Sequence, residues 1–156
     1  MPYIRVGGTS ADHTYYNESQ TVSVIESDFN ANGIPSNVQV GPAWFEGFRN
    51  FPGTLWIFQV NMWNTTDNAV REAREVLETC RGNLLAFEIG NEPDIAALVG
   101  EVKTGTFTET QYVQKWLDLA SAISSQVLEG NNYGLDEKNF FQALTFAAHN
   151  AYNYSV

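Results

Sequence analysis

Basic residues and cysteine are both scarce in this chain of 156 residues. Eight Lys and Arg residues stand against eighteen Asp and Glu residues, a formal net charge of −10. Because a polyanion would be repelled and no cluster of Lys or Arg offsets that charge, nucleic acid is not an expected partner. Cys80 is the only cysteine. An intrachain disulfide and a cysteine metal cluster are therefore excluded, and we expect a buried, unreactive thiol.

Long apolar runs are missing as well. No stretch approaches the roughly 20 apolar residues that cross a bilayer, so no membrane span is expected. A signal segment is not visible either, because Met1 and Pro2 lead directly into the strand-like Tyr3–Val6. Asn17, Asn64 and Asn153 each begin an N-glycosylation sequon. Chance alone predicts roughly two sequons in such a composition, so they favour secretion only weakly.

The residues that are present suit one globular domain. Apolar residues make up 44% of the chain, charged residues 17% and aromatic residues 13%. A chain of this length can bury a real core, and the high aromatic share suits either a large core or a sugar-binding cleft.

Hydrophobic periodicity predicts strands that alternate with helices. We expect strands at residues 3–6, 54–60, 84–89 and 140–146, a minor strand at 38–40, a short helical turn at 42–48, and helices at 66–81 and 108–130. Residues 9–37 are polar and rich in turn residues, and no regular structure is assigned to them. This alternation is typical of βαβ units with a parallel sheet. A closed (β/α)8 barrel has eight strands and about 250 residues, so the chain would supply half of one.

Both main helices carry start or stop signals. In the first, Val70, Ala73, Val76, Leu77 and Cys80 share one face, and Gly82 is placed to end it in the left-handed conformation. In the second, Thr108 and Gln111 form a capping box and Gly130 ends the helix. Its expected apolar face consists of Val113, Trp116, Leu117, Ala120, Ile123 and Val127.

Polar and aromatic residues follow each predicted strand directly. Because ligands of parallel α/β sheets bind beyond the carboxyl ends of the strands, these residues should converge. They are Gly7-Gly8 with Asp12-His13, then Asn61 and Trp63, then Asn91-Glu92, and after the last strand His149 and Tyr152. Carboxyls, amides and aromatic faces together match what a sugar requires.

Three motifs in order carry a family resemblance. Gly90-Asn91-Glu92-Pro93 resembles the Asn-Glu-Pro signature that follows the fourth strand in retaining glycosidases with (β/α)8 barrels. "IRVGGTSAD" at residues 4–12 is similar to the second-strand motif of glycoside hydrolase family 79, which includes β-glucuronidases and heparanases. "FPGTLWIFQVN" at residues 51–61 stands where that family has its third strand and a following Asn. The resemblance spans essentially the whole chain.

The resemblance implies a retaining hydrolase that cleaves β-linked glucuronic acid from glycans or glycoconjugates. Glu92 would be the general acid/base, Asn91 would hold the sugar 2-hydroxyl, and Asp12 would contact sugar hydroxyls. Asn61 and Trp63 are further candidates for substrate binding. No cofactor is expected, the partner is an oligosaccharide or glycoconjugate, and secretion follows from the family.

The sequence departs from the family at the nucleophile. A retaining enzyme needs a second carboxylate about 5–5.5 Å from the first, and in this family it follows the seventh strand. Residues 1–156 are therefore expected to be a single partial domain, covering about strands two to five, truncated at both ends and inactive alone. The alternatives are a non-catalytic carbohydrate-binding remnant and, less well matched, a small complete α/β sandwich.

Single residues also have structural alternatives. Glu92 could be a carboxylate that only favours a helix N-terminus, and Asp94 is better explained as a capping or solvated acid. A calcium site at this pair is disfavoured, since calcium takes about six to eight oxygen ligands. His13 could be structural or a substrate contact, and Trp63 could stack on a sugar or cover the rim of the sheet.

Overall fold

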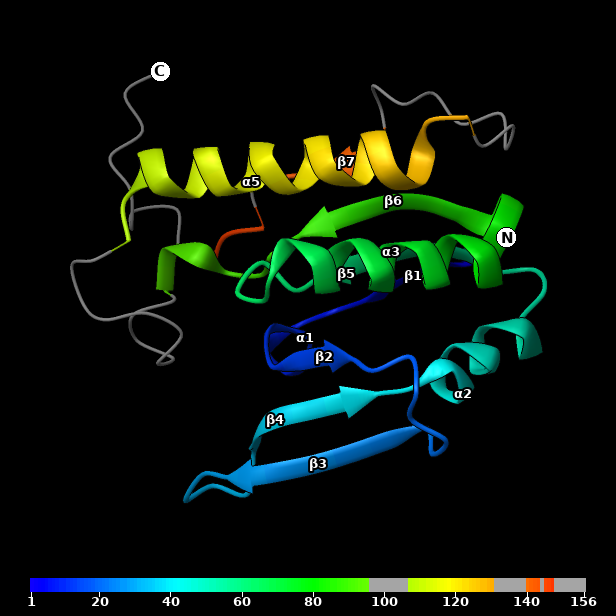
Figure 1. Cartoon of the computed structure of the whole chain (residues 1–156), viewed down its shortest axis with the longest axis horizontal. Coiled ribbons are helices and arrows are strands. Elements are labelled where there is room, and N and C mark those ends of the chain that lie inside the picture. The colour runs from blue at the N-terminus through cyan, green and yellow to red at the C-terminus, as the bar shows by residue number, and fades with distance from the viewer. Residues whose placement is uncertain (96–106, 131–139, 144, 148–156) are drawn as a thin grey trace.

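The computed structural model describes residues 1–95, 107–130, 140–143 and 145–147. Its main sheet has four strands in the order β1-β5-β6-β7, and all neighbouring pairs are parallel (Figure 1). The strands are β1 (Tyr3–Val6), β5 (Leu55–Val60), β6 (Leu84–Ile89) and β7 (Phe141–Gln142). The predicted parallel α/β sheet is confirmed, although the strand expected over 140–146 has only two residues in the described part.

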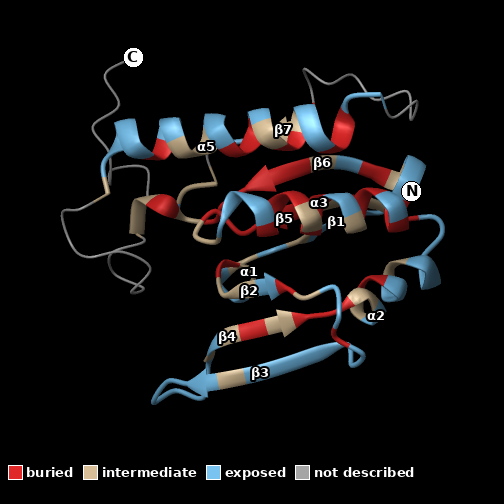
Figure 2. Ribbon diagram, viewed as in Figure 1, coloured by how far each residue is buried: buried red, intermediate tan, exposed pale blue. Residues whose placement is uncertain are grey.

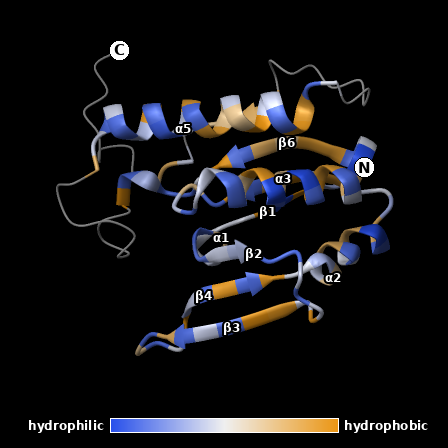
Figure 3. Ribbon diagram, viewed as in Figure 1, coloured by the Kyte–Doolittle hydropathy of each residue, from blue (hydrophilic) through white to orange (hydrophobic). Residues whose placement is uncertain are grey.

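Two long helices pack against this sheet. They are α3 (Thr66–Cys80), which contacts β5 and β6, and α5 (Glu109–Ile123), which contacts β6 and α3 and continues into the π-helical turn η4 (Ser124–Leu128). Hydrophilic and hydrophobic residues alternate along both helices, as amphipathic helices require (Figure 3). The short elements are α1 (Thr9–Asp12), α2 (Pro42–Phe45), η1 (Glu46–Asn50), η2 (Arg81–Asn83) and η3 (Pro93–Ile95).

The core lies between the helices and the sheet (Figure 2). Trp56, Phe58 and Val60 alternate along β5 and are buried, as the strand period of two requires. An aromatic cluster with edge-to-face contacts adds to this core, and it is made of Trp44, Phe45, Phe48 and Phe58. The expected core positions of α3 are buried, and so is the thiol of Cys80.

A second sheet contains the minor strand expected at residues 38–40 and also residues within 9–37, for which no regular structure was expected. Its order is β2-β4-β3, with β2 (Thr14–Tyr16) parallel and β3 (Val24–Phe29) antiparallel to β4 (Pro35–Val40). The hairpin turn forms because Asn30 Oδ1 accepts the N–H groups of Asn32 and Ile34 at 2.9 and 3.0 Å, and Gly33 adopts a φ of 74°. Most of β3 is exposed (Figure 2), so its sequence lacks a burial pattern.

The apolar face predicted for α5 is wrong at two positions. Val113 and Leu117 are 51% and 50% exposed, whereas Tyr112 and Leu119 are buried. The buried stripe is rotated because Tyr112 packs against Phe146 with ring centroids 5.5 Å apart. The capping box is confirmed: Thr108 accepts the Gln111 N–H at 3.3 Å, and the Gln111 side chain accepts the Thr108 N–H at 2.8 Å.

The predicted end of the first long helix is wrong by one residue. Arg81, not Gly82, takes the positive φ of 39° and starts the turn η2. The Arg81 Nε also donates to the Glu78 carbonyl at 3.1 Å, a contact that holds this side chain at the helix end. Gly130 has a φ of 76°, in agreement with its predicted role after α5.

Candidate carbohydrate site

Glycines shape the edge of the sheet where β1 and β6 end. A Cβ on Gly7 would lie 2.6 Å from Gln59 Oε1, so only glycine lets the chain pass this side chain. Gly90 has a φ of 77°, and a Cβ there would lie 3.0 Å from the Cβ of Met62. Gly7 and Gly90 are therefore required by close approaches at the carboxyl ends of the strands.

Asp12 is the residue at which the motifs meet. It is the last residue of α1, the helix that begins directly after Gly7-Gly8, and it is 4% exposed. Its Oδ1 accepts a hydrogen bond from Gln59 Nε2 at 2.8 Å, and its Oδ2 accepts one from Asn91 Nδ2 at 3.3 Å. One buried carboxylate thus joins residues that follow or end β1, β5 and β6.

An ion pair between the partly exposed Arg5 and the buried Glu88 lies beside this carboxylate. Arg5 Nε donates to both oxygens of Glu88 at 2.9 Å, and Arg5 Nη2 donates to Asn91 Oδ1 at 2.8 Å. Glu88 is fully buried and also accepts a hydrogen bond from Gln142 Nε2 at 3.2 Å. The hydrogen bonds to Glu88 raise the pKa of Arg5 against the opposing effect of burial, and the charges of Glu88 and Asp12 raise it further.

Glu92 is held in an uncommon backbone conformation. It is half-buried, and its φ is 44°, in the left-handed region that residues other than glycine seldom adopt. Its N–H donates to the Thr145 carbonyl at 2.7 Å, and its own carbonyl accepts the Ile95 N–H at 3.0 Å. The surroundings therefore hold the backbone of this residue against a cost of about 1 kcal/mol.

Asn61 and Trp63 stand at the end of β5. Asn61 is 5% exposed, its Nδ2 donates to the Thr14 carbonyl at 2.8 Å, and its Oδ1 accepts the Trp63 N–H at 2.8 Å. The Trp63 ring packs edge-on against Phe107, with centroids 4.9 Å apart, and Lys115 Nζ lies 5.6 Å from its centroid. Burial lowers the pKa of Lys115.

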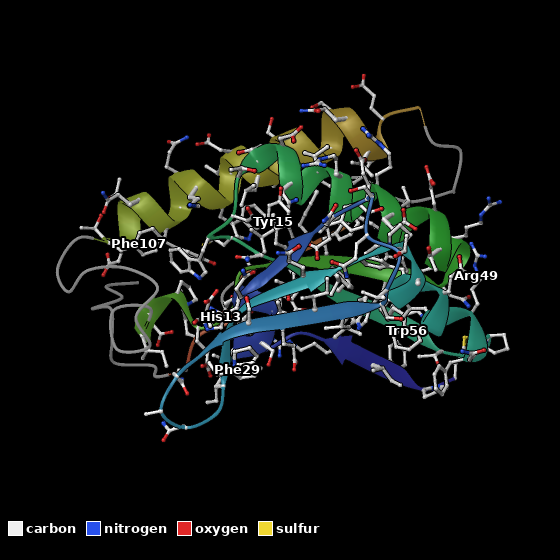
Figure 4. All side chains as sticks on the ribbon, turned by 60° about the horizontal axis from the view of Figure 1, so that its bottom comes forward. His13, Tyr15, Phe29, Arg49, Trp56 and Phe107 are labelled. Atoms are coloured by element: carbon white, nitrogen blue, oxygen red, sulfur yellow. The ribbon has the colours of Figure 1, made fainter. Side chains whose placement is uncertain are left out.

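A cleft of about 250 Å³ brings together three of the predicted substrate-binding residues, Asp12, Asn61 and Trp63. It is lined by Asp12, His13, Thr14, Tyr15, Ser36, Asn61, Trp63 and Asn64. Asn91 joins it through its hydrogen bond to Asp12, whereas Glu92 follows one residue further along the turn and is not among the lining residues. Figure 4 shows His13 and Phe107 toward one end of the molecule, and Trp56 and Arg49 toward the other.

The other candidates fall in different places. Asp94 Oδ1 accepts the Ala147 N–H at 3.0 Å, which is a structural contact. Of the glycosylation candidates, Asn17 accepts hydrogen bonds from Ser19 at 2.9 and 3.2 Å. Asn64 Nδ2 is engaged by Asn68 Oδ1 at 2.7 Å. Asn153, His149 and Tyr152 lie outside the described residues.

Three residues of this site were missed by the sequence analysis. Arg5, Gln59 and Glu88 all lie within strands, where side-chain hydrogen bonds and charge are uncommon. A polar residue in each of three otherwise apolar strands was the available signal, because buried polar groups need partners.

No three His, Cys, Asp or Glu side chains are grouped for metal binding in the part of the chain that the structure describes. Within those same residues, none of the helices combines the length and apolar character needed to cross a membrane.

A mixed α/β fold with a polar cleft beyond its parallel strands belongs to the class in which small ligands bind at the carboxyl ends of the strands. No family model matches the chain. It is 32% identical over 143 residues to a β-glucuronidase of Neurospora crassa, and 29% identical over 142 residues to one of Aspergillus niger. These alignments cover 83% and 82% of this chain, but 25% of each relative, so the chain spans about a quarter of their length.

A solved structure is also similar. It is that of a 4-O-α-L-rhamnosyl-β-D-glucuronidase from Fusarium oxysporum, with a TM-score of 0.72 and 22% identity over 93% of this chain and 30% of that one. At this identity the likeness concerns the fold. The comparisons confirm the resemblance to β-glucuronidases that the motifs indicated, and the assignment to family 79 stays a prediction.

Proposed function

We propose that residues 1–156 are part of a retaining glycoside hydrolase that removes β-linked glucuronic acid from a glycan or glycoconjugate. One observation carries the proposal above the others: the Asp of the first motif and the Asn of the Asn-Glu-Pro motif are hydrogen-bonded, 79 residues apart in the sequence. The similarity to two curated β-glucuronidases supports the same substrate class.

Each candidate residue has a role in this proposal. Glu92 protonates the leaving glycosidic oxygen and then activates a water molecule, as the acid/base of a retaining enzyme does. Asn91 and Asp12 contact sugar hydroxyls, and their mutual hydrogen bond sets the direction of both. Asn61 and Trp63 form the wall of the cleft beside Asp12. The side-chain amide of Asn61 already bonds the Thr14 carbonyl and the Trp63 N–H. Asn61 therefore contributes to sugar binding indirectly, by fixing the position of the Trp63 indole.

The proposal also extends the fold. The four parallel strands would be strands two to five of a (β/α)8 barrel, and the nucleophile would stand after the seventh strand, outside residues 1–156. We further propose that the protein is secreted, as the family resemblance implies.

The test is hydrolysis of aryl and alkyl β-D-glucuronides by the protein that the complete transcript encodes. We expect Glu92→Gln to lower kcat by at least about 10³-fold for an alkyl glucuronide, which needs acid assistance, and by much less for a nitrophenyl glucuronide. Asp94→Asn, two residues away, is the matched control and should keep its activity. An active enzyme that tolerates Glu92→Gln with both substrates would contradict the assignment.

Azide provides a second readout. With Glu92→Ala and a nitrophenyl glucuronide, azide should attack the glucuronyl-enzyme and restore turnover, giving a β-glucuronyl azide. If the protein binds D-glucuronate but no glucuronide is cleaved by the complete protein, the non-catalytic carbohydrate-binding alternative would stand instead.

A further inference from the structure

Gln59 is a buried polar side chain for which the site described above has assigned no role. It lies near the end of β5 and is 1% exposed. Its Nε2 donates to Asp12 Oδ1 at 2.8 Å, and its Oε1 accepts the Gly8 N–H at 2.6 Å. The same Oε1 lies 3.4 Å from Arg5 Nη2. All three contacts join Gln59 to the segment from Arg5 to Asp12, which carries the first motif.

These contacts determine which way the amide points. A carboxylate only accepts hydrogen bonds, whereas a backbone N–H and a guanidinium only donate them. Rotating the Gln59 amide by 180° would place its oxygen against Asp12 and its NH2 group against Gly8 and Arg5. The orientation with Nε2 toward Asp12 is therefore the only one in which every contact is satisfied.

Asn91 has the same arrangement from the neighbouring strand. Its Oδ1 accepts a hydrogen bond from Arg5 at 2.8 Å, and its Nδ2 donates to Asp12 Oδ2 at 3.3 Å. Two amides thus bridge one cation and one carboxylate in parallel, with their oxygens toward Arg5 and their N–H groups toward Asp12. One oxygen of Asp12 faces each amide, which defines the rotation of the carboxylate.

We propose that Gln59 is a positioning residue of the sugar site, which acts through Asp12: it holds the Asp12 carboxylate in the rotation that lets Asn91 face the substrate. This inference rests on the proposed function for its substrate but not for its geometry. It also accounts for the glycine at position 7, because a Cβ there would lie 2.9 Å from Gln59 Cβ and 2.6 Å from its Oε1.

Replacing Gln59 by Glu tests whether Gln59 positions the Asp12 carboxylate or only fills the space beside it. The shape is preserved, but an oxygen now faces Asp12 Oδ1 at the 2.8 Å of the present contact. When two carboxyl groups lie so close together, they share one proton, because ionising both would place two negative charges in contact. Protonated Glu at this position can donate to Asp12 as the amide does. At higher pH the proton is lost, and the two carboxylates repel each other.

The experiment measures the affinity for D-glucuronate by calorimetry at pH 5.5 and pH 7.5. Gln114→Glu is the matched control, because Gln114 Nε2 also donates to an Asp carboxylate, Asp118, at 2.8 Å, on the exposed surface of α5. We expect Gln59→Glu to bind within about threefold of this control at pH 5.5 and at least about tenfold more weakly at pH 7.5. Equal affinity ratios at both pH values would overturn the proposal.

A second measurement does not depend on sugar binding. The carboxyl carbon of Asp12, followed by NMR, should report the loss of the shared proton in Gln59→Glu between pH 5.5 and pH 7.5, and no such step in Gln114→Glu. If that step is seen while no variant binds D-glucuronate, the positioning role stands and the proposed function fails. If wild type binds D-glucuronate but the step is missing, the positioning role fails alone.

Gln59→Met covers the case in which the Glu variant does not fold. Methionine keeps the length of the side chain but cannot donate to Asp12. We expect affinity for D-glucuronate about tenfold below wild type at both pH values. Wild-type affinity in a folded Gln59→Met protein would overturn the proposal.

Discussion

Glu72 makes the stability of this protein depend on pH in an unusual direction. The residue lies on the buried face of α3 and is 2% exposed. It lines a cavity of about 290 Å³ whose other walls include Trp44 and Phe58. Burial in these surroundings raises the pKa of Glu72 to about 8, and a hydrogen bond from the Asn61 backbone offsets only part of this effect.

The sign follows from the two pKa values. The pKa of Glu72 is about 8 in the folded protein, against an ordinary value of 4.5, so between these pH values the folded state binds the extra proton. The contribution of Glu72 to stability is therefore greatest below pH 4.5 and falls as the pH rises toward 8. At about 1.36 kcal/mol per unit, the loss reaches about 1 kcal/mol at pH 5.5, about 3 at pH 7 and nearly 5 at pH 8.5.

Glu72→Gln removes the ionisation while keeping the shape. We expect the variant to exceed wild type in the free energy of unfolding by those same amounts, so that the difference grows with pH. Urea denaturation followed by tryptophan fluorescence at pH 5.5, 7 and 8.5 measures it, and all three values lie above the sequence pI of about 4.4. Glu78→Gln, on the exposed side of the same helix, is the control. A difference that does not change between pH 5.5 and 8.5 would refute the reasoning.

Three further predictions concern stability and reactivity. Glu88→Gln removes the charge that pairs with Arg5, whose side chain is 35% exposed, and should lower the free energy of unfolding in urea by about 1–2 kcal/mol; an unchanged midpoint would contradict this. Thr108→Ala removes the capping box of α5 and should cost about 1 kcal/mol in the same assay, whereas Thr110→Ala should cost less. Burial raises the pKa of the Cys80 thiol to about 12, so iodoacetamide at pH 8 should alkylate it about a thousandfold more slowly than in urea, measured by mass spectrometry.

Local signals in the sequence predicted most of the main sheet. The apolar runs that became β5 and β6 are buried, and a buried strand needs no distant partner to be recognised from its composition. The capping box at Thr108 was predicted for the same reason, because both of its hydrogen bonds join residues three apart.

Predictions failed where neighbours in space decide the outcome. Of the small sheet, only the strand at residues 38–40 was predicted, because β3 is mostly exposed and its pairing with β4 depends on a hairpin turn at Asn30. The buried stripe of α5 was misplaced because Val113 and Tyr112 are both apolar enough to be core residues. Tyr112 is the one that is buried, because its ring packs against Phe146.

The sequence by itself determined the order of strands and helices, and it placed Asp12, Asn61 and Asn91 just after predicted strands. These properties follow from periodicity and chain connectivity, which are local. Only the tertiary structure decided that Arg5 and Gln59 belong to the same site. A polar residue inside a strand has no partner within its own segment, so its hydrogen bonds are defined only when parallel strands align residues as far apart as Asp12 and Asn91.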